Sequence, residues 1–428
     1  MVIGHIYRAL GGGGMQRGTG AILKVHHNMG HKIVLFTRLP PEENDYKITV
    51  PYEQIVIGGG KLSEPATPER TRLLKEGLTR TKCDLVIHHE YFGFSITEDL
   101  RTIAELGIPV LVQWHSCFTA LHFAVEWRGR NAALLADIRK YSRGVLTLSK
   151  MDKVFFESQG IAAFHIPYSD PDLFDQVPEH GDGHEIVWTG RFTKGKQPLH
   201  AFKILDKVLE RYPDAHLTML GAGKSMETIN KYMTMHPVVS QRVSMPGFVN
   251  DVTPYLAKAS VFLITTRYEG FCHAIVEAKM AALPIVGYEM DYLDTAQPGS
   301  GYLAVPQGDV DAAAERICSL FADRDERLRQ GAAGRRDFER LLKLDQCAMY
   351  QEAFDAALTK EIRPVAISDP SLLPRIVTVL LEHVDFVCER DAKEMRDLHR
   401  SYSFRVGRLL TAPIRFLYRF FGKAKFKQ

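Results

Sequence analysis

The pattern of apolar and polar positions predicts alternating strands and helices along most of the chain. Short apolar runs rich in β-branched residues are typical of buried strands, and apolar residues spaced three and four apart are typical of helices. The predicted strands are 2–8, 31–38, 84–88, 110–114, 145–148, 186–190, 216–220, 243–248, 261–266 and 285–288. The predicted helices are 17–29, 69–79, 95–106, 131–140, one that begins at 149, 273–282, most of 309–358, and 375–400. This alternation favours parallel sheets covered by helices on both faces.

The stretch 261–288 has the strongest local pattern, which is a strand, a glycine-containing turn and then a helix that stops before Pro284. In such a unit, ligands bind at the carboxyl edge of the sheet, in front of the amino terminus of the helix. The unpaired N–H groups of Gly270, Phe271 and Cys272 therefore suit a phosphate.

Two carboxylates flank this turn, Glu269 on the loop and Glu277 on the helix. Acids this close to a phosphate site would repel the ligand unless they bind its hydroxyl groups, as carboxylates do with ribose and hexoses. A sugar nucleotide offers both kinds of group. A solvated loop glutamate and a solvated helix glutamate fit the same spacing, so the spacing alone leaves both interpretations open.

A basic glycine loop follows the predicted strand that begins at residue 186. It contains Gly190, Arg191, Lys194 and Lys196. A guanidinium and an ammonium five residues apart at the carboxyl end of a strand can neutralise a diphosphate through charge-assisted hydrogen bonds. Two exposed cations without a ligand are the alternative.

Four consecutive glycines, 11–14, follow the first predicted strand. They let the backbone come close to a ligand or to another domain, and a flexible loop is the alternative. The loop lacks the third glycine of a dinucleotide fingerprint and the lysine of a Walker loop. His115 also follows a predicted strand, at the sheet edge where sites form.

Other histidines are expected to be structural. His88 and His89 are adjacent on an extended chain, so their side chains point to opposite faces and cannot easily share a metal ion. His26, His27 and His31 lie on or just beyond a predicted helix without the carboxylate of a zinc-binding H-E-x-x-H motif.

Together these patterns resemble the retaining glycosyltransferases of family 4. Glu269 and Glu277 resemble the E-x7-E signature of the family, and the glycine loop with Arg17 resembles its G-G-x-x-R motif. The residues that carry the resemblance, in chain order, are Gly13, Gly14, Arg17, Gly30, His31, His115, Gly190, Arg191, Lys196, Gly221, Phe248, Glu269 and Glu277. The resemblance extends over about residues 1–355.

The resemblance implies the GT-B fold, an α/β architecture in which two Rossmann-like domains with parallel sheets face each other across a cleft. The expected divisions are an N-terminal acceptor domain at 1–170, a linker at 171–184, a C-terminal donor-nucleotide domain with a crossover helix at 185–358, and a helical extension with a basic amphipathic tail at 359–428.

The resemblance also implies roles for individual residues. The expected catalytic residues are Arg191, Lys196, Glu269 and His115. The expected donor-binding residues are Gly13, Gly14, Gly190, Phe248, Gly270, Phe271, Cys272 and Glu277. In the family both cations hold the donor phosphates, the first glutamate lies beside the donor sugar and the second holds the ribose. Lys194 with Gly195 offers an alternative register for the lysine. No metal and no cofactor other than the nucleotide sugar are expected.

The expected function is the retaining transfer of a hexosyl unit from a nucleoside diphosphate sugar, UDP-linked, to a hydroxyl of a glycan or lipid-linked glycan in cell-surface polysaccharide synthesis. Three alternatives remain open. They are an inactive sugar-nucleotide-binding subunit of a polysaccharide assembly complex, a sugar-nucleotide epimerase and a phosphorylase.

Composition agrees with a globular enzyme of two domains and an appendage, because the 428 residues are 45% hydrophobic and 25% charged. The six cysteines show no paired spacing, which argues against a disulfide framework or a zinc ribbon and for a reducing compartment. The first residues predict a strand rather than a signal peptide, and no apolar run is long enough to span a bilayer. The expected location is the cytoplasm, at the inner face of the membrane.

Charge is distributed unevenly along the chain. Residues 400–428 contain eight basic and no acidic residues, so the net charge of +3 leaves −5 for residues 1–399. The basic residues alternate with aromatic and aliphatic ones, which is typical of an anchor on an anionic membrane surface. A helical cap on the domain is one alternative, and an arm that binds nucleic acid is another. We expect the membrane surface and no nucleic-acid partner.

Overall fold

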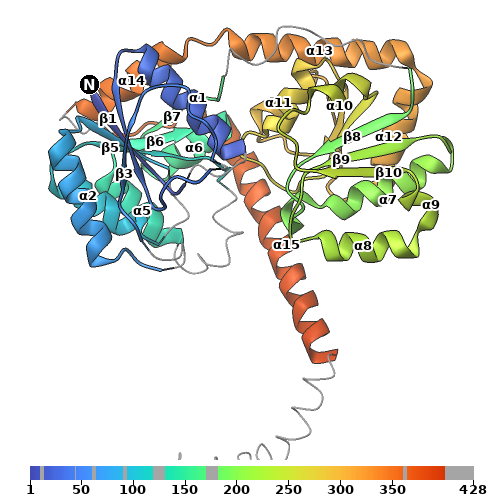
Figure 1. The fold of residues 1–428 in the computed structure, drawn as a ribbon, viewed down its shortest axis with the longest axis horizontal. Coiled ribbons are helices and arrows are strands. Elements are labelled where there is room, and N and C mark those ends of the chain that lie inside the picture. Colours follow the sequence, from blue (N-terminus) through green and yellow to red (C-terminus); the bar gives the residue numbers. More distant parts are fainter. Residues whose placement is uncertain are drawn as a thin grey trace, which may run out of the picture.

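The computed structural model describes residues 1–9, 14–43, 45–59, 64–89, 94–118, 131–169, 182–359 and 364–400. These residues form two lobes, each built on a parallel sheet with helices on both faces (Figure 1). The first lobe holds strands from residues 2–165 and the second holds strands from residues 185–305.

In the described part of the chain, the first sheet has seven parallel strands in the order β3-β2-β1-β4-β5-β6-β7. Their bounds are β1 Val2–Tyr7, β2 Lys32–Thr37, β3 Glu53–Val56, β4 Leu85–His88, β5 Val110–Gln113, β6 Gly144–Thr147 and β7 Ala163–His165. The helices of this lobe are α1 Gly14–Asn28, α2 Pro68–Thr81, α3 Ile96–Glu105, α5 Asn131–Tyr141 and α6 Lys150–Ser158.

The second sheet has six parallel strands among the described residues, in the order β10-β9-β8-β11-β12-β13. Their bounds are β8 Glu185–Thr189, β9 His216–Leu220, β10 Val243–Gly247, β11 Val261–Ile264, β12 Ile285–Tyr288 and β13 Tyr302–Val305. The α-helices of this lobe are α7 Pro198–Leu209, α8 Met226–Met235, α9 Pro237–Ser240, α10 Thr253–Lys258, α11 His273–Met280, α12 Val310–Ala322 and α13 Arg324–Leu342. Short 3-10 turns occur at η2 Lys194–Lys196 and η3 Asp294–Ala296.

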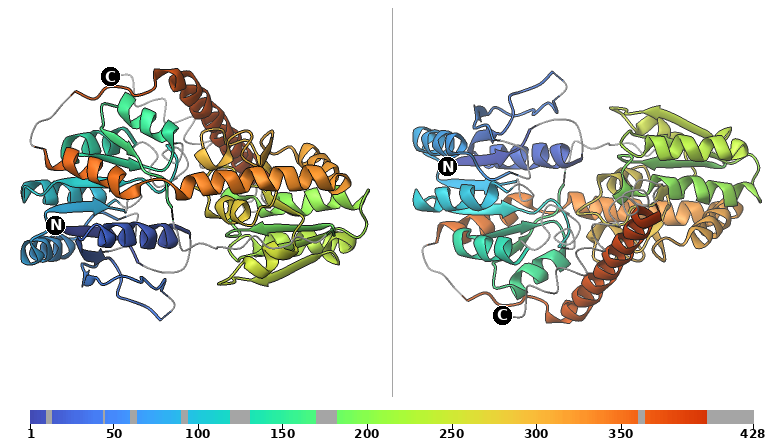
Figure 2. Two further views of the ribbon diagram at one scale, coloured as in Figure 1. Left: turned by 90° about the horizontal axis from the view of Figure 1, so that it is seen from above. Right: turned by 90° about the horizontal axis from the view of Figure 1, so that it is seen from below.

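The chain returns to the first lobe after α13. Helix α13 packs on α11 of the second lobe, and α14 Gln346–Leu358 packs on α1 of the first (Figure 2). Tyr350 and Phe354 of α14 are fully buried there. This is the crossover helix that the sequence predicts.

The last described elements are η4 Pro370–Leu372 and α15 Leu373–Arg400. Helix α15 begins at the junction of the lobes and extends away from both (Figure 1). It contacts α6 of the first lobe, and Arg375 at its start forms an ion pair with Asp291 of the second. No helix among the described residues has the length and apolar content needed to cross a bilayer.

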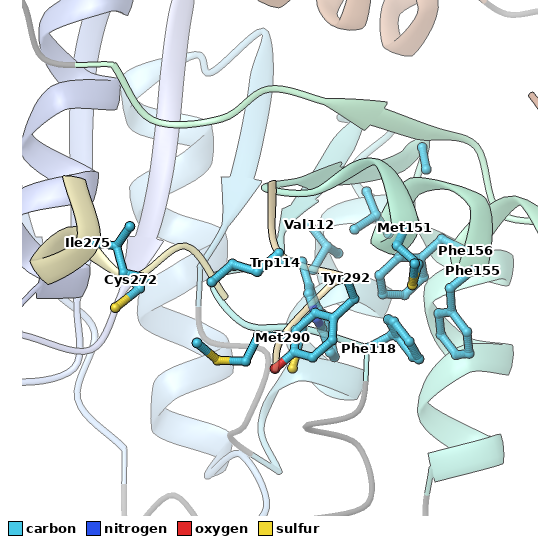
Figure 3. Packing of buried hydrophobic residues seen from close by; sticks show 14 of the residues in the cluster. Val112, Trp114, Phe118, Met151, Phe155, Phe156, Cys272, Ile275, Met290 and Tyr292 are labelled. Carbon is cyan, nitrogen blue, oxygen red and sulfur yellow. The ribbon is translucent and has the colours of Figure 1, made fainter. Parts of the chain in front are cut away.

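The two lobes share an apolar core at their junction. Trp114 and Phe118 of the first lobe lie beside Met290 and Tyr292 of the second (Figure 3). The ring centres of Phe118 and Tyr292 are 6.2 Å apart. The lobes are therefore in direct contact through buried side chains.

Most predicted elements are present, with shifted ends. Helix α1 begins at Gly14, a turn before the predicted start, and β11 ends at Ile264 rather than 266. Just after the strand, the hydroxyls of Thr265 and Thr266 donate to the carbonyls of Lys196 and Gly195. The sequence pattern does not predict β3, β7, β13 or α7–α10.

Candidate functional site

Sheet topology brings the two predicted halves of the site together. Strand β8 pairs with β11, with Ile186 opposite Val261, so the loops that follow these strands lie at the same edge of the sheet. The strand order reverses at this pair, and the crevice at such a point is where ligands bind in open parallel sheets. The loop after β8 contains Arg191 and Lys196, and the loop after β11 contains Glu269.

Lys196 and Glu269 form an ion pair between these loops, from Nζ to Oε1. Their side chains are 25% and 11% exposed. Burial lowers the pKa of Lys196, but the neighbouring Glu269 carboxylate outweighs burial and the net pKa is raised. The exposed Arg191 is close enough to act electrostatically on Lys196. Lys194, the alternative lysine, is exposed.

Glycines let the loops of this edge pass close to one another. A Cβ on Gly221, after β9, would lie 2.0 Å from the carbonyl oxygen of Gly190, and Gly221 has φ +132°. Both the space and the backbone conformation therefore exclude a side chain there. The predicted glycine at 190 thus packs against the next loop of the sheet.

The start of α11 is held in an unusual backbone conformation. Cys272 precedes the helix with φ +61°, a left-handed conformation that is uncommon for a residue with a Cβ. The helix has no side-chain cap, so its first N–H groups keep the capacity to bind a ligand. Cys272 is buried, and burial raises the pKa of its thiol.

Glu277, on α11, forms an ion pair with Arg17 of α1, so this pair joins the two lobes. The side chains are 31% and 11% exposed for Arg17 and Glu277. Burial raises the pKa of Glu277, and the Arg17 guanidinium opposes that effect. Arg17 belongs to the G-G-x-x-R motif, but the sequence pattern predicts no role for it in the site.

His273, the first residue of α11, lies near a cation of each ion pair. Its ring stacks on Tyr168, with centres 5.2 Å apart and planes at 16°, and it forms a hydrogen bond with the backbone of Gly14. Burial lowers the pKa of His273 to about 3, and the charges of Arg17 and Lys196 act in the same direction. The ring is therefore neutral at pH 7, between both cations.

Gly270 lies against the first lobe. A Cβ on Gly270 would be 2.5 Å from both the carbonyl oxygen of His115 and the Cα of Ser116. Since both atoms belong to the backbone, no side-chain movement could relieve the clash. The glycine in the turn after β11 is thus required for the contact between the lobes.

His115 lies at this contact. Its Nε2 is 2.8 Å from Nδ1 of His89, and its Nδ1 is hydrogen-bonded to the hydroxyl of Tyr168. Burial lowers the pKa of His115 to about 3, and His273 contributes in the same direction. His115 is therefore a neutral group at the interface.

Among the remaining predicted donor-binding residues, Gly14 lies beside this site, because a Cβ on it would be 3.1 Å from Cδ2 of His273. Gly13 is outside the described residues. Gly14 is not in a loop but begins α1. Phe248 follows the edge strand β10, two strands from β8, and is 68% exposed.

Arg17, Tyr168 and His273 are the residues that sequence reasoning missed. Arg17 and His273 lie inside the motifs that carry the resemblance, so their positions offered a signal. Tyr168 offered none, because its role depends on contacts with helices far away in the sequence.

The cavity lined by Arg17, Tyr168, Phe271 and His273 measures about 10 Å³, roughly the space of one water molecule. A larger cavity of about 420 Å³ lies between α15 and the loops after β11, β12 and β13. In the described part of the chain, no group of three or more His, Cys, Asp or Glu side chains is arranged to hold a metal ion.

Two family models match different parts of the chain. A family model described as Glycosyltransferase Family 4 matches residues 12–171, and one described as Glycosyl transferases group 1 matches residues 183–323. The chain belongs to glycosyltransferase family 4. Residues 172–182 separate the two matches, and they lie between the last strand of the first sheet and the first strand of the second.

Curated relatives match one part of this family 4 chain. It is 28% identical over 154 residues to the lipopolysaccharide core biosynthesis glycosyltransferase LpsE of Rhizobium meliloti, which is 36% of this chain and 44% of LpsE. It is 31% identical over 156 residues to a GDP-mannose-dependent monoacylated alpha-(1-6)-phosphatidylinositol monomannoside mannosyltransferase of Corynebacterium glutamicum, which is 34% of this chain and 39% of the relative. The matched segments thus span less than half of either relative.

Solved structures confirm the GT-B fold of this family 4 chain. Sucrose-phosphate synthase from Thermosynechococcus elongatus superposes with a TM-score of 0.65 at 18% identity, covering 83% of this chain and 99% of that one. Anabaena HepE in complex with UDP and glucose superposes with a TM-score of 0.63 at 14% identity, covering 82% and 98%. The prediction of two Rossmann-like domains with parallel sheets is therefore correct.

Proposed function

We propose that the chain is a retaining glycosyltransferase that moves a hexosyl unit from a UDP-linked sugar to a hydroxyl of a glycan or lipid-linked glycan. The observation that carries the proposal is the pairing of Glu269 with Lys196 at the carboxyl ends of β8 and β11, and of Glu277, on the helix that follows β11, with Arg17 of the first lobe. The cations can bind the phosphates of a ligand, and the carboxylates can bind its hydroxyls.

In this proposal Arg191, Lys196 and the first N–H groups of α11 bind the donor diphosphate. Breaking the bond between the sugar and the diphosphate produces an oxocarbenium-like centre and a more negative leaving group, so stabilising that charge is the main catalytic task. The diphosphate replaces Glu269 as the partner of Lys196. Glu269 then becomes free to accept hydrogen bonds from the donor hexose.

Glu277 holds the ribose in the same proposal. Its carboxylate is paired with Arg17 of the other lobe through Oε1. In this proposal the ribose displaces Arg17 from Glu277, which loosens the contact between the lobes at this pair. Domain opening around a bound ligand is a common motion in proteins with two lobes.

The named relatives support the substrate class. LpsE acts in lipopolysaccharide core biosynthesis, the Corynebacterium glutamicum protein transfers mannose to a phosphatidylinositol mannoside, and HepE was solved with UDP and glucose. These names favour a nucleotide-sugar donor and an acceptor in a glycan or glycolipid. The relative that depends on GDP-mannose makes a GDP-linked sugar the alternative to a UDP-linked one.

No cofactor has a role in the proposed reaction, because side chains and helix N–H groups neutralise the leaving group. We therefore expect turnover to be unchanged by EDTA. A loss of turnover in EDTA that is restored by a divalent cation would contradict this part of the proposal.

The test is to incubate the purified chain with a panel of UDP- and GDP-linked hexoses and to measure nucleotide release with and without glycan acceptors. Release of UDP that depends on acceptor supports the proposal. Binding without release identifies an inactive binding subunit. A changed sugar nucleotide without acceptor identifies an epimerase, and dependence on inorganic phosphate identifies a phosphorylase.

The basic tail supports a second part of the proposal. Residues 401–428 lie outside the described residues, and their composition is the basis for proposing that the chain binds an anionic membrane surface from the cytoplasm. Co-sedimentation with anionic liposomes tests this, with neutral liposomes and a chain that ends at Arg400 as controls. Binding that survives the truncation would contradict the role of the tail.

A further inference from the structure

A row of histidines crosses the first lobe from its interior to the domain interface. His26 lies on α1, His5 on β1, and His89 and His115 directly after β4 and β5. Nδ1 of His26 is 3.3 Å from Nε2 of His5, Nδ1 of His5 is 3.0 Å from Nε2 of His89, and Nδ1 of His89 is 2.8 Å from Nε2 of His115. Nδ1 of His115 meets the hydroxyl of Tyr168.

Each contact in this row joins Nδ1 of one ring to Nε2 of the next. Burial lowers the pKa of His5 and of His115 to about 3, and it holds the pKa values of His26 and His89 well below 6.5. All four rings are therefore neutral at pH 7, so each carries one ring proton. A neutral imidazole donates through one nitrogen and accepts through the other.

Because each contact between two rings holds one proton, the four rings can adopt only two combinations of tautomers. Either every ring carries its proton on Nδ1 and donates toward Tyr168, or every ring carries it on Nε2 and donates toward His26. A ring with the other tautomer would leave two N–H groups or two lone pairs facing each other in a buried contact, which loses a hydrogen bond and leaves polar groups unsatisfied.

The two ends of the row have different surroundings. Nε2 of His26 is buried and has no hydrogen-bond partner among the described residues. The ring packs against Tyr350 and Phe354 of the crossover helix, with centres 4.4 and 5.1 Å away. At the other end, Tyr168 stacks on His273 and contacts Phe271 of the second lobe.

We propose that His26, His5 and His89 act as positioning residues that share one tautomer with His115 and thereby fix the direction in which the Tyr168 hydroxyl donates its hydrogen bond. With the protons on Nδ1, the hydroxyl accepts from His115 and can donate to another group. With the protons on Nε2, the hydroxyl donates to His115 and presents only lone pairs. The row thus sets the polarity of a group next to His273 at the domain interface.

The tautomer coupling can be tested without any substrate. The full chain is labelled with ¹⁵N in its histidine rings, and ring tautomers are determined by NMR at pH 7.5, with signals assigned from single variants. We expect His5, His26, His89 and His115 to show the same tautomer. Different tautomers among these four rings, or a charged ring among them, would overturn the proposal.

The effect on turnover rests on the proposed glycosyl transfer and needs a second experiment. His5→Phe interrupts the row far from the interface while keeping a ring of similar size, and Ile87→Ala is the control because Ile87 is buried in the same face of the same sheet. We expect His5→Phe to lower kcat about tenfold, the equivalent of one fixed hydrogen bond, with the donor KM within about twofold. Equal kcat in the two variants would overturn the positioning role.

His26→Phe repeats the measurement if His5→Phe folds poorly, since its ring lies among the aromatic side chains of α14. We expect the same split between kcat and KM in this variant, and kcat equal to that of Ile87→Ala would again count against positioning. A wild-type chain that turns over no donor would defeat the proposed function, whereas the shared tautomer would still be judged by the NMR experiment alone.

Discussion

Arg17 and Glu277 form an ion pair although 260 residues separate them, and the pair joins α1 of the first lobe to α11 of the second. The same carboxylate is the one that the resemblance assigns to the donor ribose. In the proposed function, binding of a donor and contact between the lobes compete for Glu277. This competition would link ligand binding to domain opening.

Replacing Glu277 tests its proposed contact with the donor. Hydrogen bonds to charged groups contribute about 1.5–3 kcal/mol, so we expect Glu277→Ala to weaken donor binding by about ten- to a hundredfold. Isothermal titration calorimetry with UDP-sugars measures the change. Glu315→Ala, at an exposed position of the same lobe, is the control and should leave affinity unchanged. Equal affinity in Glu277→Ala and the wild type would remove Glu277 from the donor site.

The two lysines of the loop after β8 give a matched pair. Lys196 pairs with Glu269, whereas Lys194 is exposed two residues earlier. Because Lys196 neutralises the leaving group in the proposal, we expect Lys196→Ala to lower kcat about a hundredfold and Lys194→Ala to lower it less than threefold. Steady-state kinetics of nucleotide release distinguishes the two. A larger loss in Lys194→Ala would favour the alternative register.

A methyl group at Gly270 should force the lobes apart. The added Cβ would meet backbone atoms of His115 and Ser116 at 2.5 Å. Overpacking of this kind costs about 1–3 kcal/mol, so we expect Gly270→Ala to lower the melting temperature and to reduce turnover. Gly183→Ala is the control, because a Cβ there meets nothing within 4 Å. If Gly270→Ala matched this control in both measurements, the contact between the lobes would not matter.

Buried histidines should make the protein sensitive to acid. The pKa values of His5, His115 and His273 are lowered to about 3 by burial, against 6.5 for an exposed imidazole. The unfolded chain therefore takes up protons before the folded one does, so stability is intact above pH 6.5 and falls as the pH drops below it. With three such groups, the free energy of unfolding falls by about 4 kcal/mol for each pH unit below 6.5. Chemical denaturation at pH 7.5, 6.5 and 5.5 measures this slope, and equal stability at 7.5 and 5.5 would contradict it.

Asp152 should have the opposite effect on the pH dependence of stability. Burial raises its pKa to about 7, while the hydrogen bonds from Ser149 and the Phe118 N–H limit the rise and Asp294 adds to it. The folded state thus binds a proton that the unfolded state has released, and this contribution to stability is lost as the pH rises from about 4 to 7. We expect Asp152→Asn, which resembles the protonated acid, to make the acid-induced loss steeper. An unchanged slope would mean that Asp152 is already ionised at pH 5.5.

Local patterns were sufficient to predict the strand, turn and helix around Glu269, because each depends on residues close in sequence. The pattern also indicated that His88 and His89 point to opposite faces, and the structure confirms this, since His88 bonds to Asp99 while His89 bonds to His115. The crossover helix was expected from the resemblance to the family, and the helical pattern of 309–358 agreed with it.

The partners of the charged residues were not predictable in the same way. The pairing of Arg17 with Glu277 depends on how two lobes meet, and no spacing in the chain encodes that distance. The histidine row was missed for the same reason, because its members come from α1, β1 and the ends of β4 and β5. Strand order, which is set by packing over the whole lobe, brings them together.

The most direct test of the account is the stereochemistry of the reaction. The purified chain is incubated with a UDP-linked α-hexose and an acceptor, and the anomeric configuration of the product is determined by NMR, with Glu277→Ala run in parallel. We expect an α-linked product from the wild type and a strongly reduced yield from the variant. A β-linked product, or equal yields from the wild type and Glu277→Ala, would contradict it.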